Sequence, residues 1–277
     1  MFWAISEAVA RKRPLIHFTD DYVPHSVRTS LVQNAFIEVG SLWTKFNLPG
    51  IHDQQDVEDI INRFCTKYPS LTPVWDKIQC TVEATKDELQ QAGFLEKLFW
   101  PLKLANVELP TYIVPIKPKW AIDLFDSRLG RQTLFGSDPN LMFSMDNVYY
   151  RRVSTKLPTA PSRVLWYVSK GDEPQLQGTM AIRACSYVEE VVIGTPAEIF
   201  KKFSNLGVYR WQDVLATAND QLNTQILAFR FSHTELFNAP ISFEEWKKIK
   251  QQKLAPLAPV PITGDAFLTI YRQGTER

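Results

Sequence analysis

Apolar residues in the first hundred positions recur mainly at helical spacing. The segment from Asp53 to Tyr68 carries four of them three or four positions apart, at Val57, Ile60, Ile61 and Phe64. The same spacing resumes after Pro73 and continues to Trp100, with Gly93 as the expected end of a helix. Such intervals align side chains on one face, so this part of the chain is predicted to form amphipathic helices.

A shorter pattern of helix and strand precedes these helices. Pro24 opens a predicted helix, and the residues from Phe36 to Leu48 are predicted to form two short strands around Gly40 and Ser41. A helix followed by a small hairpin is typical of winged-helix units, in which a helix can enter the major groove of DNA. We therefore interpret residues 1–105 as a mainly helical domain, with a winged helix as one hypothesis.

Strand patterns dominate the second half. The predicted strands are NVYYRR (147–152), RVLWYVS (163–169), TMAIRACSYVEEVVI (179–193), QILAFRFSHTELFNAPIS (225–242) and FLTIY (267–271). Helices are predicted over 120–130 and from Pro196 to Leu206. Many strands with few helices indicate a small mixed β-barrel whose ends are capped by helices.

The two halves are separated by a proline-rich stretch. The stretch from Pro101 to Pro118 contains four prolines, and proline at this density favours an edge strand or a linker. We place the domain boundary near residue 105, which gives a helical domain over 1–105 and a barrel domain over 106–277. The proline-rich tail from Lys253 to Asp265 is predicted to be extended. The predicted fold class is α+β.

The charge balance excludes a global attraction to nucleic acid or membrane. Lys and Arg number 31 against 30 Asp and Glu, a net charge of +1, so an anionic partner must meet a local patch. No apolar run approaches the roughly 20 residues of a membrane helix, and the N-terminus lacks a secretory-signal pattern. The 3 cysteines have no zinc-binding spacing. We expect a soluble, cytoplasmic protein without metal, cofactor or membrane partner.

The second half also carries a family resemblance. YYRR, then PSRVLWYVS, then the glycine-led strand GTMAIRACSYVEEV, a helix and the closing FRFSHTELFNAPIS together resemble the PUA-like superfamily, which contains PUA, ASCH, EVE and YTH domains. The resemblance covers roughly residues 134–250. It implies a pseudo-barrel whose cleft binds RNA or DNA, in several members a modified or flipped base. The whole chain is also similar to the C-terminal part of acetyltransferase-linked proteins, some of them associated with toxin–antitoxin systems, although it lacks the acetyltransferase phosphate loop.

A basic and aromatic segment is the candidate binding site. Between Asn147 and Lys170 the chain has five Lys and Arg residues and no acid, a surplus that suits backbone phosphates. Aromatic residues are interleaved with them, and stacking on a ring is worth ~1–3 kcal/mol per base. The predicted nucleic-acid-binding residues are Tyr149, Tyr150, Arg151, Arg152, Arg163, Trp166, Tyr167, Ser169 and Lys170.

Several of these residues have a second interpretation. Trp166 suits a core as well as a stacking platform, and its neighbour Tyr167 faces the opposite side of a strand. Arg151 and Arg152 also diverge by alternation, so at most one of them points into a given cleft. Ser169 suits the capping of a turn as well as contact with a base edge.

Catalysis has less support in the sequence. ASCH-type hydrolases use a lysine, a hydroxyl residue and a carboxylate, and the corresponding strand NVYYRR has no lysine. In an extended strand His233 and Glu235 share a face opposite Thr234, so we expect a surface pair rather than an acid–base dyad. No catalytic residue is assigned. The prediction is a nucleic-acid-binding protein; the alternatives are an acetyltransferase-linked enzyme or subunit and a protein-binding regulator of a toxin–antitoxin type.

Overall fold

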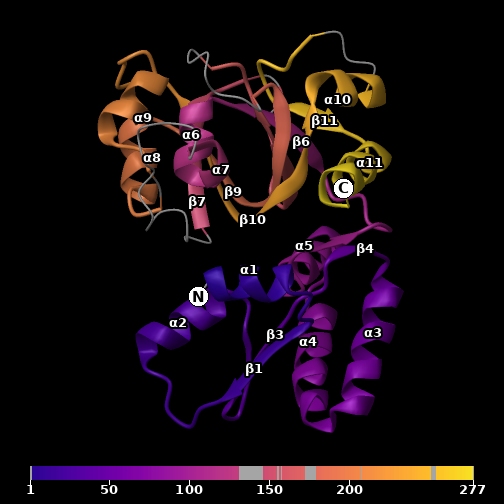
Figure 1. Ribbon diagram of the computed structural model, residues 1–277. Helices are drawn as coiled ribbons and strands as arrows, with labels where there is room; N and C mark the ends of the chain where they lie inside the picture. The colour runs from indigo at the N-terminus through magenta and orange to yellow at the C-terminus, as the bar shows by residue number, and fades with distance from the viewer. Residues whose placement is uncertain are drawn as a thin grey trace. The chain divides into compact units, whose positions relative to one another are not determined.

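The protein divides into two compact units, residues 1–109 and 110–277. A computed structural model describes residues 2–130, 146–154, 156, 158–171, 179–206, 208–250 and 254–276, shown in Figure 1. Both units mix helices and strands, so the predicted α+β class is confirmed. Lys253 lies outside the described residues.

Unit 1 begins with a small antiparallel sheet. Its elements are α1 (Phe2–Ala10), β1 (Leu15–Thr19), α2 (His25–Gln33), β2 (Ile37–Val39) and β3 (Leu42–Phe46), and the strand order is β1-β3-β2. The predicted helix after Pro24 and the predicted hairpin are confirmed. Gly40 joins β2 to β3 with a φ of +58°, a left-handed conformation that glycine adopts without strain.

The rest of unit 1 is mainly helical, as predicted. The elements are β4 (Gly50–His52), α3 (Gln54–Lys67), a 3-10 turn (Pro69–Leu71), α4 (Thr72–Ala84), α5 (Glu88–Leu98) and β5 (Leu102–Leu104). Val57 and Ile61 of α3 face the core together with Trp75 of α4. The helix end expected at Gly93 is wrong: α5 continues to Leu98, because Leu95 and Leu98 add buried apolar surface to the same core.

Lys45 in β3 is a fully buried amine. Its Nζ donates hydrogen bonds to the carbonyl oxygens of Lys97, at 3.1 Å, and Leu98, at the end of α5. Burial lowers the pKa of Lys45 from 10.5 to about 7. Between pH 7 and pH 10.5, the Lys45 amine is therefore protonated in the unfolded chain and neutral in the folded chain. Folding stability therefore rises with pH across this window.

Unit 2 consists of a curved sheet with helices around it. Its strands are β6 (Thr111–Ile116), β7 (Asp146–Arg152), β8 (Ser162–Val168), β9 (Ala181–Gly194), β10 (Ile226–Ser242) and β11 (Val260–Ile262). Its helices are α6 (Pro118–Leu124), α7 (Ser127–Gly130), α8 (Pro196–Phe203), α9 (Trp211–Thr217), α10 (Phe243–Lys250) and α11 (Gly264–Thr275). In Figure 1, α8 and α9 flank one side of the sheet, and α10 and α11 flank the other.

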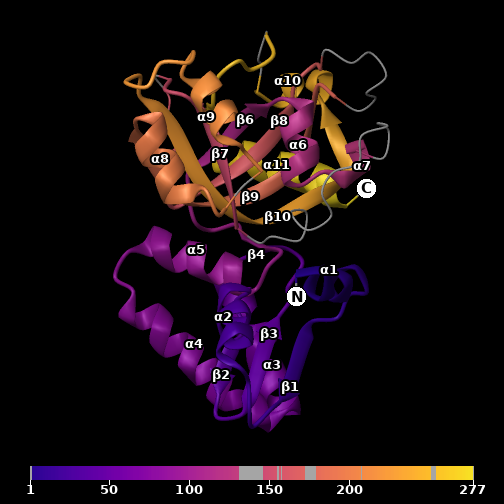
Figure 2. The same ribbon diagram turned by 90° about the vertical axis from the view of Figure 1, so that its left-hand side faces the viewer.

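The sheet of unit 2 has the order β11-β6-β8-β9-β10-β7. Only β6 and β8 pair in parallel, while the other neighbours are antiparallel. β9 and β10 are long and strongly curved (Figure 2), and β-bulges shift their register after Arg230, Ser232 and Leu236. Bulges bend a strand and increase its twist, so this sheet curls into a barrel-like form.

β6 lies inside the sheet, so the expectation of an edge strand or linker is wrong. Pro115 is tolerated in β6 because the backbone N–H that proline lacks would not point toward β8. The carbonyl of Ile116 accepts a hydrogen bond from Ser169, after the end of β8, and successive residues face opposite neighbours. Pro115 therefore points away from β8, and β11 on that side pairs only with Thr111–Ile113.

The last predicted strand is also wrong, since Phe267–Tyr271 lies within helix α11. Thr263 caps this helix by accepting a hydrogen bond from the backbone N–H of Ala266. Phe267, Ile270, Tyr271 and Gly274 are its buried residues. Their spacing of three and four residues fits a helix face against the sheet.

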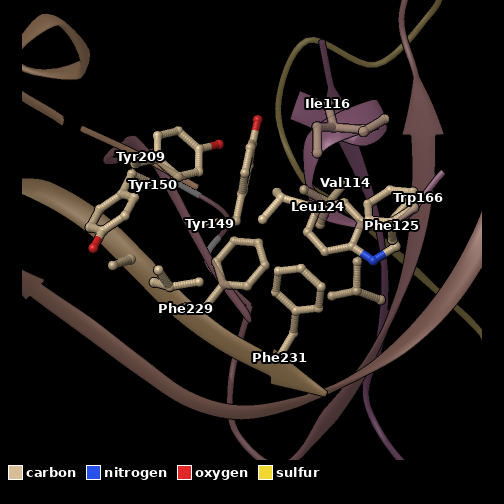
Figure 3. Packing of buried hydrophobic residues seen from close by; sticks show 14 of the residues in the cluster. Val114, Ile116, Leu124, Phe125, Tyr149, Tyr150, Trp166, Tyr209, Phe229 and Phe231 are labelled. Atoms are coloured by element: carbon tan, nitrogen blue, oxygen red, sulfur yellow. The ribbon is translucent and has the colours of Figure 1, made fainter. Parts of the chain in front are cut away.

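One large apolar core fills the concave side of the unit 2 sheet. Trp166 of β8 packs against Phe125, Phe229 and Phe231, with ring centroids 4.8–5.8 Å apart. Figure 3 shows these rings, with Tyr149, Tyr150 and Tyr209 at the other end of the same core. The opposite side of the sheet is covered by α10 and α11 through contacts such as Tyr167 with Trp246.

Candidate nucleic-acid interface

Four aromatic residues from separate parts of unit 2 meet at one end of its core. Tyr149 and Tyr150 come from β7, Trp120 from α6, and Tyr209 from the connection just before α9. We call these four residues the aromatic cluster. The Trp120 and Tyr209 rings are stacked at a centroid distance of 4.1 Å and an interplanar angle of 24°. Tyr209 also contacts Tyr150 at 5.0 Å and Tyr149 at 6.4 Å, both edge to face.

The three tyrosine hydroxyls of the aromatic cluster differ in their surroundings. The Tyr149 hydroxyl donates a hydrogen bond to the carbonyl of Pro115 at 3.2 Å, which links β7 to β6. Burial raises the pKa of both Tyr149 and Tyr150 to about 12. The Tyr209 hydroxyl is buried and has no hydrogen-bond partner within the described part of the chain. Burial, followed by the nearby Tyr149 and Asp213, holds the pKa of Tyr209 well above its usual value.

Arg151 lies two residues after Tyr149 on the same face of β7. Its Nε and Nη1 atoms are buried, and neither has a hydrogen-bond partner among the described residues. Burial lowers the pKa of its guanidinium, while Tyr149 acts in the opposite direction. A buried donor without an acceptor costs free energy. An acceptor on a ligand would remove this cost, and it reaches the two buried atoms only if neighbouring side chains move.

Charged residues of both signs surround the aromatic cluster. Lys119 of α6 is exposed, and its Nζ lies 4.4 Å from the centroid of the Trp120 ring. Burial raises the pKa of Asp123 in α6, the nearby Lys119 lowers it, and the nearby Asp213 of α9 raises it. The site thus offers rings, a cation next to a ring, and carboxylates.

Arg152 points away from Arg151, as strand alternation predicts. Its Nε donates to the carbonyl of Thr217 at 3.3 Å, and its Nη2 donates to the Asn219 side chain. Both acceptors lie at or just after the end of α9. The Arg152 guanidinium therefore already has acceptors within the protein, and it anchors α9 to β7.

The remaining predicted site residues do not join the aromatic cluster. Trp166 is fully buried, and its Nε1 donates to the Ser186 hydroxyl at 2.8 Å. It touches the cluster only from inside, edge to face with Tyr149 at 5.4 Å. Of the two interpretations of Trp166, the core residue fits the structure, and its ring is closed to a base from solvent.

Tyr167, Arg163, Ser169 and Lys170 also lie elsewhere. Tyr167 packs on the opposite side of the sheet, as alternation predicts, against α10. Arg163 is buried, with its guanidinium 4.4 Å from the Phe267 ring centroid of α11. Ser169 donates from its backbone N–H and its hydroxyl to the carbonyl of Ile116, which fits the turn-capping interpretation, and Lys170 is exposed.

The segment from His233 to Glu235 is not the surface pair that the sequence predicts. His233 is buried and adopts a φ of +53° at a bulge in β10. The bulge breaks the alternation, so the three residues contact different partners. The Ser232 hydroxyl lies 2.7 Å from His233 Nδ1, Thr234 bonds Ser186, and Glu235 accepts from Tyr271.

Two members of the aromatic cluster were not among the predicted site residues. Trp120 falls in the helix predicted over 120–130, and in the structure both rings pack against the apolar core of unit 2. Trp120 and Tyr209 lie 89 positions apart in the chain. No local pattern indicates that their rings meet. For Trp120 the remaining signal is Pro118 at the start of α6, which places this aromatic residue in the first turn of a helix.

Within the described ranges no helix has the length and apolar character needed to cross a membrane. The same part of the chain contains no group of three or more His, Cys, Asp or Glu side chains that could hold a metal ion.

Comparisons with known proteins gave matches only among solved structures. No protein-family model matches the chain, and no curated protein matches it. The chain is similar to ASCH from Zymomonas mobilis. The TM-score to that crystal structure is 0.42 at 14% identity, covering 58% of this chain and 93% of the other. A serine-to-alanine mutant of the same protein gives 0.42 at 14% identity, covering 60% and 96%. A tyrosine-to-phenylalanine mutant gives 0.43 at 12%, covering 58% and 96%.

ASCH domains are one of the groups in the PUA-like superfamily that the sequence resembles. At these identities no residue role or activity passes from those proteins to this chain.

Proposed function

We propose that unit 2 binds single-stranded nucleic acid, RNA or DNA, at the aromatic cluster and Arg151. The observation that carries this proposal is the guanidinium of Arg151, with two buried donors that have no acceptor among the described residues. Phosphate oxygens and the acceptor edges of bases are the groups in nucleic acid that arginine binds best. A nucleic acid would supply the hydrogen-bond acceptors that these two donors of Arg151 lack.

The surroundings of Arg151 favour a nucleic acid over a simple anion. Trp120 is half-buried and is the ring of the aromatic cluster on which a base can stack, while Tyr149, Tyr150 and Tyr209 are buried beneath it. Lys119 adds a cation beside the Trp120 ring. Rings next to cations are the usual composition of sites that bind single strands, because the rings meet bases and the cations meet the backbone. A base has to leave a duplex to stack in this way, so we expect single strands or flipped bases.

The sequence also predicts the kind of nucleic acid bound and a role for unit 1. The resemblance to PUA-like domains supports RNA or DNA as the ligand, with a modified or flipped base as one form of it. For unit 1, the strand order β1-β3-β2, with α2 ahead of the hairpin, supports the winged-helix prediction without assigning a ligand. The acetyltransferase-linked enzyme and the toxin–antitoxin regulator stay predictions from the sequence.

The test is a titration of a fluorescently labelled 12-nucleotide RNA, and of the DNA of the same sequence, with the full-length chain. Arg151→Met is expected to weaken binding by about 5-fold or more, since a contact of this kind is worth about 1–3 kcal/mol. If Arg151 meets a phosphate, the slope of log affinity against log salt also falls by about 1. If it meets a base edge, the slope stays the same and sequence preference relaxes.

Arg272→Met is the matched control, because Arg272 is an exposed arginine on α11, across the sheet from the aromatic cluster. It is expected to bind like the wild type. Equal losses for Arg151→Met and Arg272→Met would show a general charge effect and would count against the site. Binding that is unchanged by Arg151→Met would overturn the proposal.

A further inference from the structure

The stack between Trp120 and Tyr209 occupies a surface on which a base could stack. Tyr209 is 6% exposed, and its ring lies 4.1 Å from that of Trp120. Trp120 is only half-buried and stands in α6 with Lys119 beside it. In the structure, the Trp120 face toward the core is therefore already filled by a ring of this chain.

The position of Tyr209 carries a cost. Its hydroxyl is buried without a hydrogen-bond partner in the described part of the chain, and the carboxylates of Asp123 and Asp213 lie near enough to raise its pKa further. An unsatisfied buried hydroxyl disfavours its state by roughly 5- to 150-fold in an equilibrium constant. Moving the ring outward lets water bond the hydroxyl and removes this cost.

Tyr209 also separates Trp120 from the rest of the aromatic cluster. Its ring contacts Tyr150 at 5.0 Å and Tyr149 at 6.4 Å, and Figure 3 shows it beside both rings. Tyr149 is close enough to Arg151 for each to shift the pKa of the other. A planar ligand in the place of Tyr209 would therefore contact Trp120 and lie next to the tyrosine pair that leads to Arg151.

We propose that Tyr209 is an internal competitor of the ligand, whose ring a nucleobase displaces from Trp120. This inference rests on the proposed function and adds a closed state to it. The closed state is held by ring stacking and weakened by the unpaired hydroxyl. Apparent affinity then scales with the fraction of molecules in which Tyr209 has left Trp120.

Two substitutions of Tyr209 are expected to act in opposite directions. Tyr209→Phe keeps the ring and removes the unpaired hydroxyl, so the closed state becomes more stable and binding of the 12-nucleotide RNA weakens by roughly 5-fold or more. The melting temperature of this variant rises. Tyr209→Ala removes the competing ring, so binding becomes tighter than for the wild type.

The outcomes separate this inference from the proposed function. The competition is overturned if Tyr209→Phe and Tyr209→Ala both bind like the wild type, or if both bind more weakly. In either case, a loss of binding with Arg151→Met still supports the site. Wild-type protein that does not bind the RNA overturns both. Because Tyr209→Ala removes a core ring, its fold is checked by circular dichroism. If it does not fold, Tyr209→Phe decides: weaker binding supports the competition, and equal or tighter binding overturns it.

Discussion

Replacing Arg151 by methionine is predicted to stabilise unit 2 while it weakens binding. The guanidinium has Nε and Nη1 buried without acceptors among the described residues. Leaving buried donors unsatisfied costs about 1–3 kcal/mol. Methionine fills the volume of the arginine stem without any donor, so the variant should recover free energy of this order.

The gain can be expressed as a melting temperature. For a domain of 150–250 residues, 1 kcal/mol shifts the midpoint by about 2–4 °C. Arg151→Met is therefore expected to raise the unfolding midpoint of unit 2 by about 2–12 °C. Differential scanning calorimetry on the full-length chain measures this shift, and the transition of unit 2 is assigned as the one that Gly274→Ala lowers.

Arg152→Met is the matched control, because the neighbouring arginine has acceptors in Thr217 and Asn219. Its replacement loses these hydrogen bonds, so its midpoint should fall slightly or stay unchanged. A midpoint that falls with Arg151→Met would mean that the Arg151 guanidinium has partners within the protein. The reasoning behind the binding site would then be refuted.

Three further predictions concern the cores. Lys45→Met is expected to remove part of the pH dependence of unit 1. The pKa of Lys45 is lowered to about 7, so the wild type should gain stability relative to the variant as the pH rises from 7 to 9.5. Urea titrations measure the two unfolding free energies, and a difference between them that stays constant with pH contradicts this. Gly274→Ala should destabilise unit 2 by about 1–3 kcal/mol, because an added Cβ would lie 2.3 Å from the Phe237 ring; relief by Phe237→Leu in a double-mutant cycle tests the cause. Ser186→Ala should cost about 1–3 kcal/mol in denaturant unfolding by leaving Trp166 Nε1 without its acceptor, and no loss would show that water replaces the hydroxyl.

The strands of unit 2 could be predicted because their apolar runs are long. β8 and β9 carry apolar residues on both faces, which only a strand buried on both sides requires. Phe267–Tyr271 has the same local composition as a strand. The structure makes it a helix because the sheet offers an apolar face that a helix capped at Thr263 can cover. Composition over five residues does not contain that information.

The candidate site could be predicted only in part, for a geometric reason. Alternation correctly separates Arg151 from Arg152 and Trp166 from Tyr167. It does not tell which face of a strand meets the core and which meets solvent. Trp166 is consequently a core residue, while Tyr149 and Arg151 lie toward the end of that core.

The partners of Tyr149 and Arg151 depend on tertiary contacts. Trp120 and Tyr209 come from different helical regions and meet only when β7, α6 and α9 pack together. The unpaired donors of Arg151 are likewise a property of the packed molecule. Such features emerge from the fold, and sequence patterns within a few residues cannot indicate them.

Mapping of photochemical crosslinks tests the central claim most directly. The full-length chain is irradiated with a 12-nucleotide RNA that contains 4-thiouridine, and the crosslinked peptides are identified by mass spectrometry. Crosslinks are predicted in the peptides that carry Trp120, Tyr149 or Tyr209, and they should diminish with Arg151→Met. Crosslinks confined to unit 1, or to α10 and α11, would contradict a binding site at the aromatic cluster.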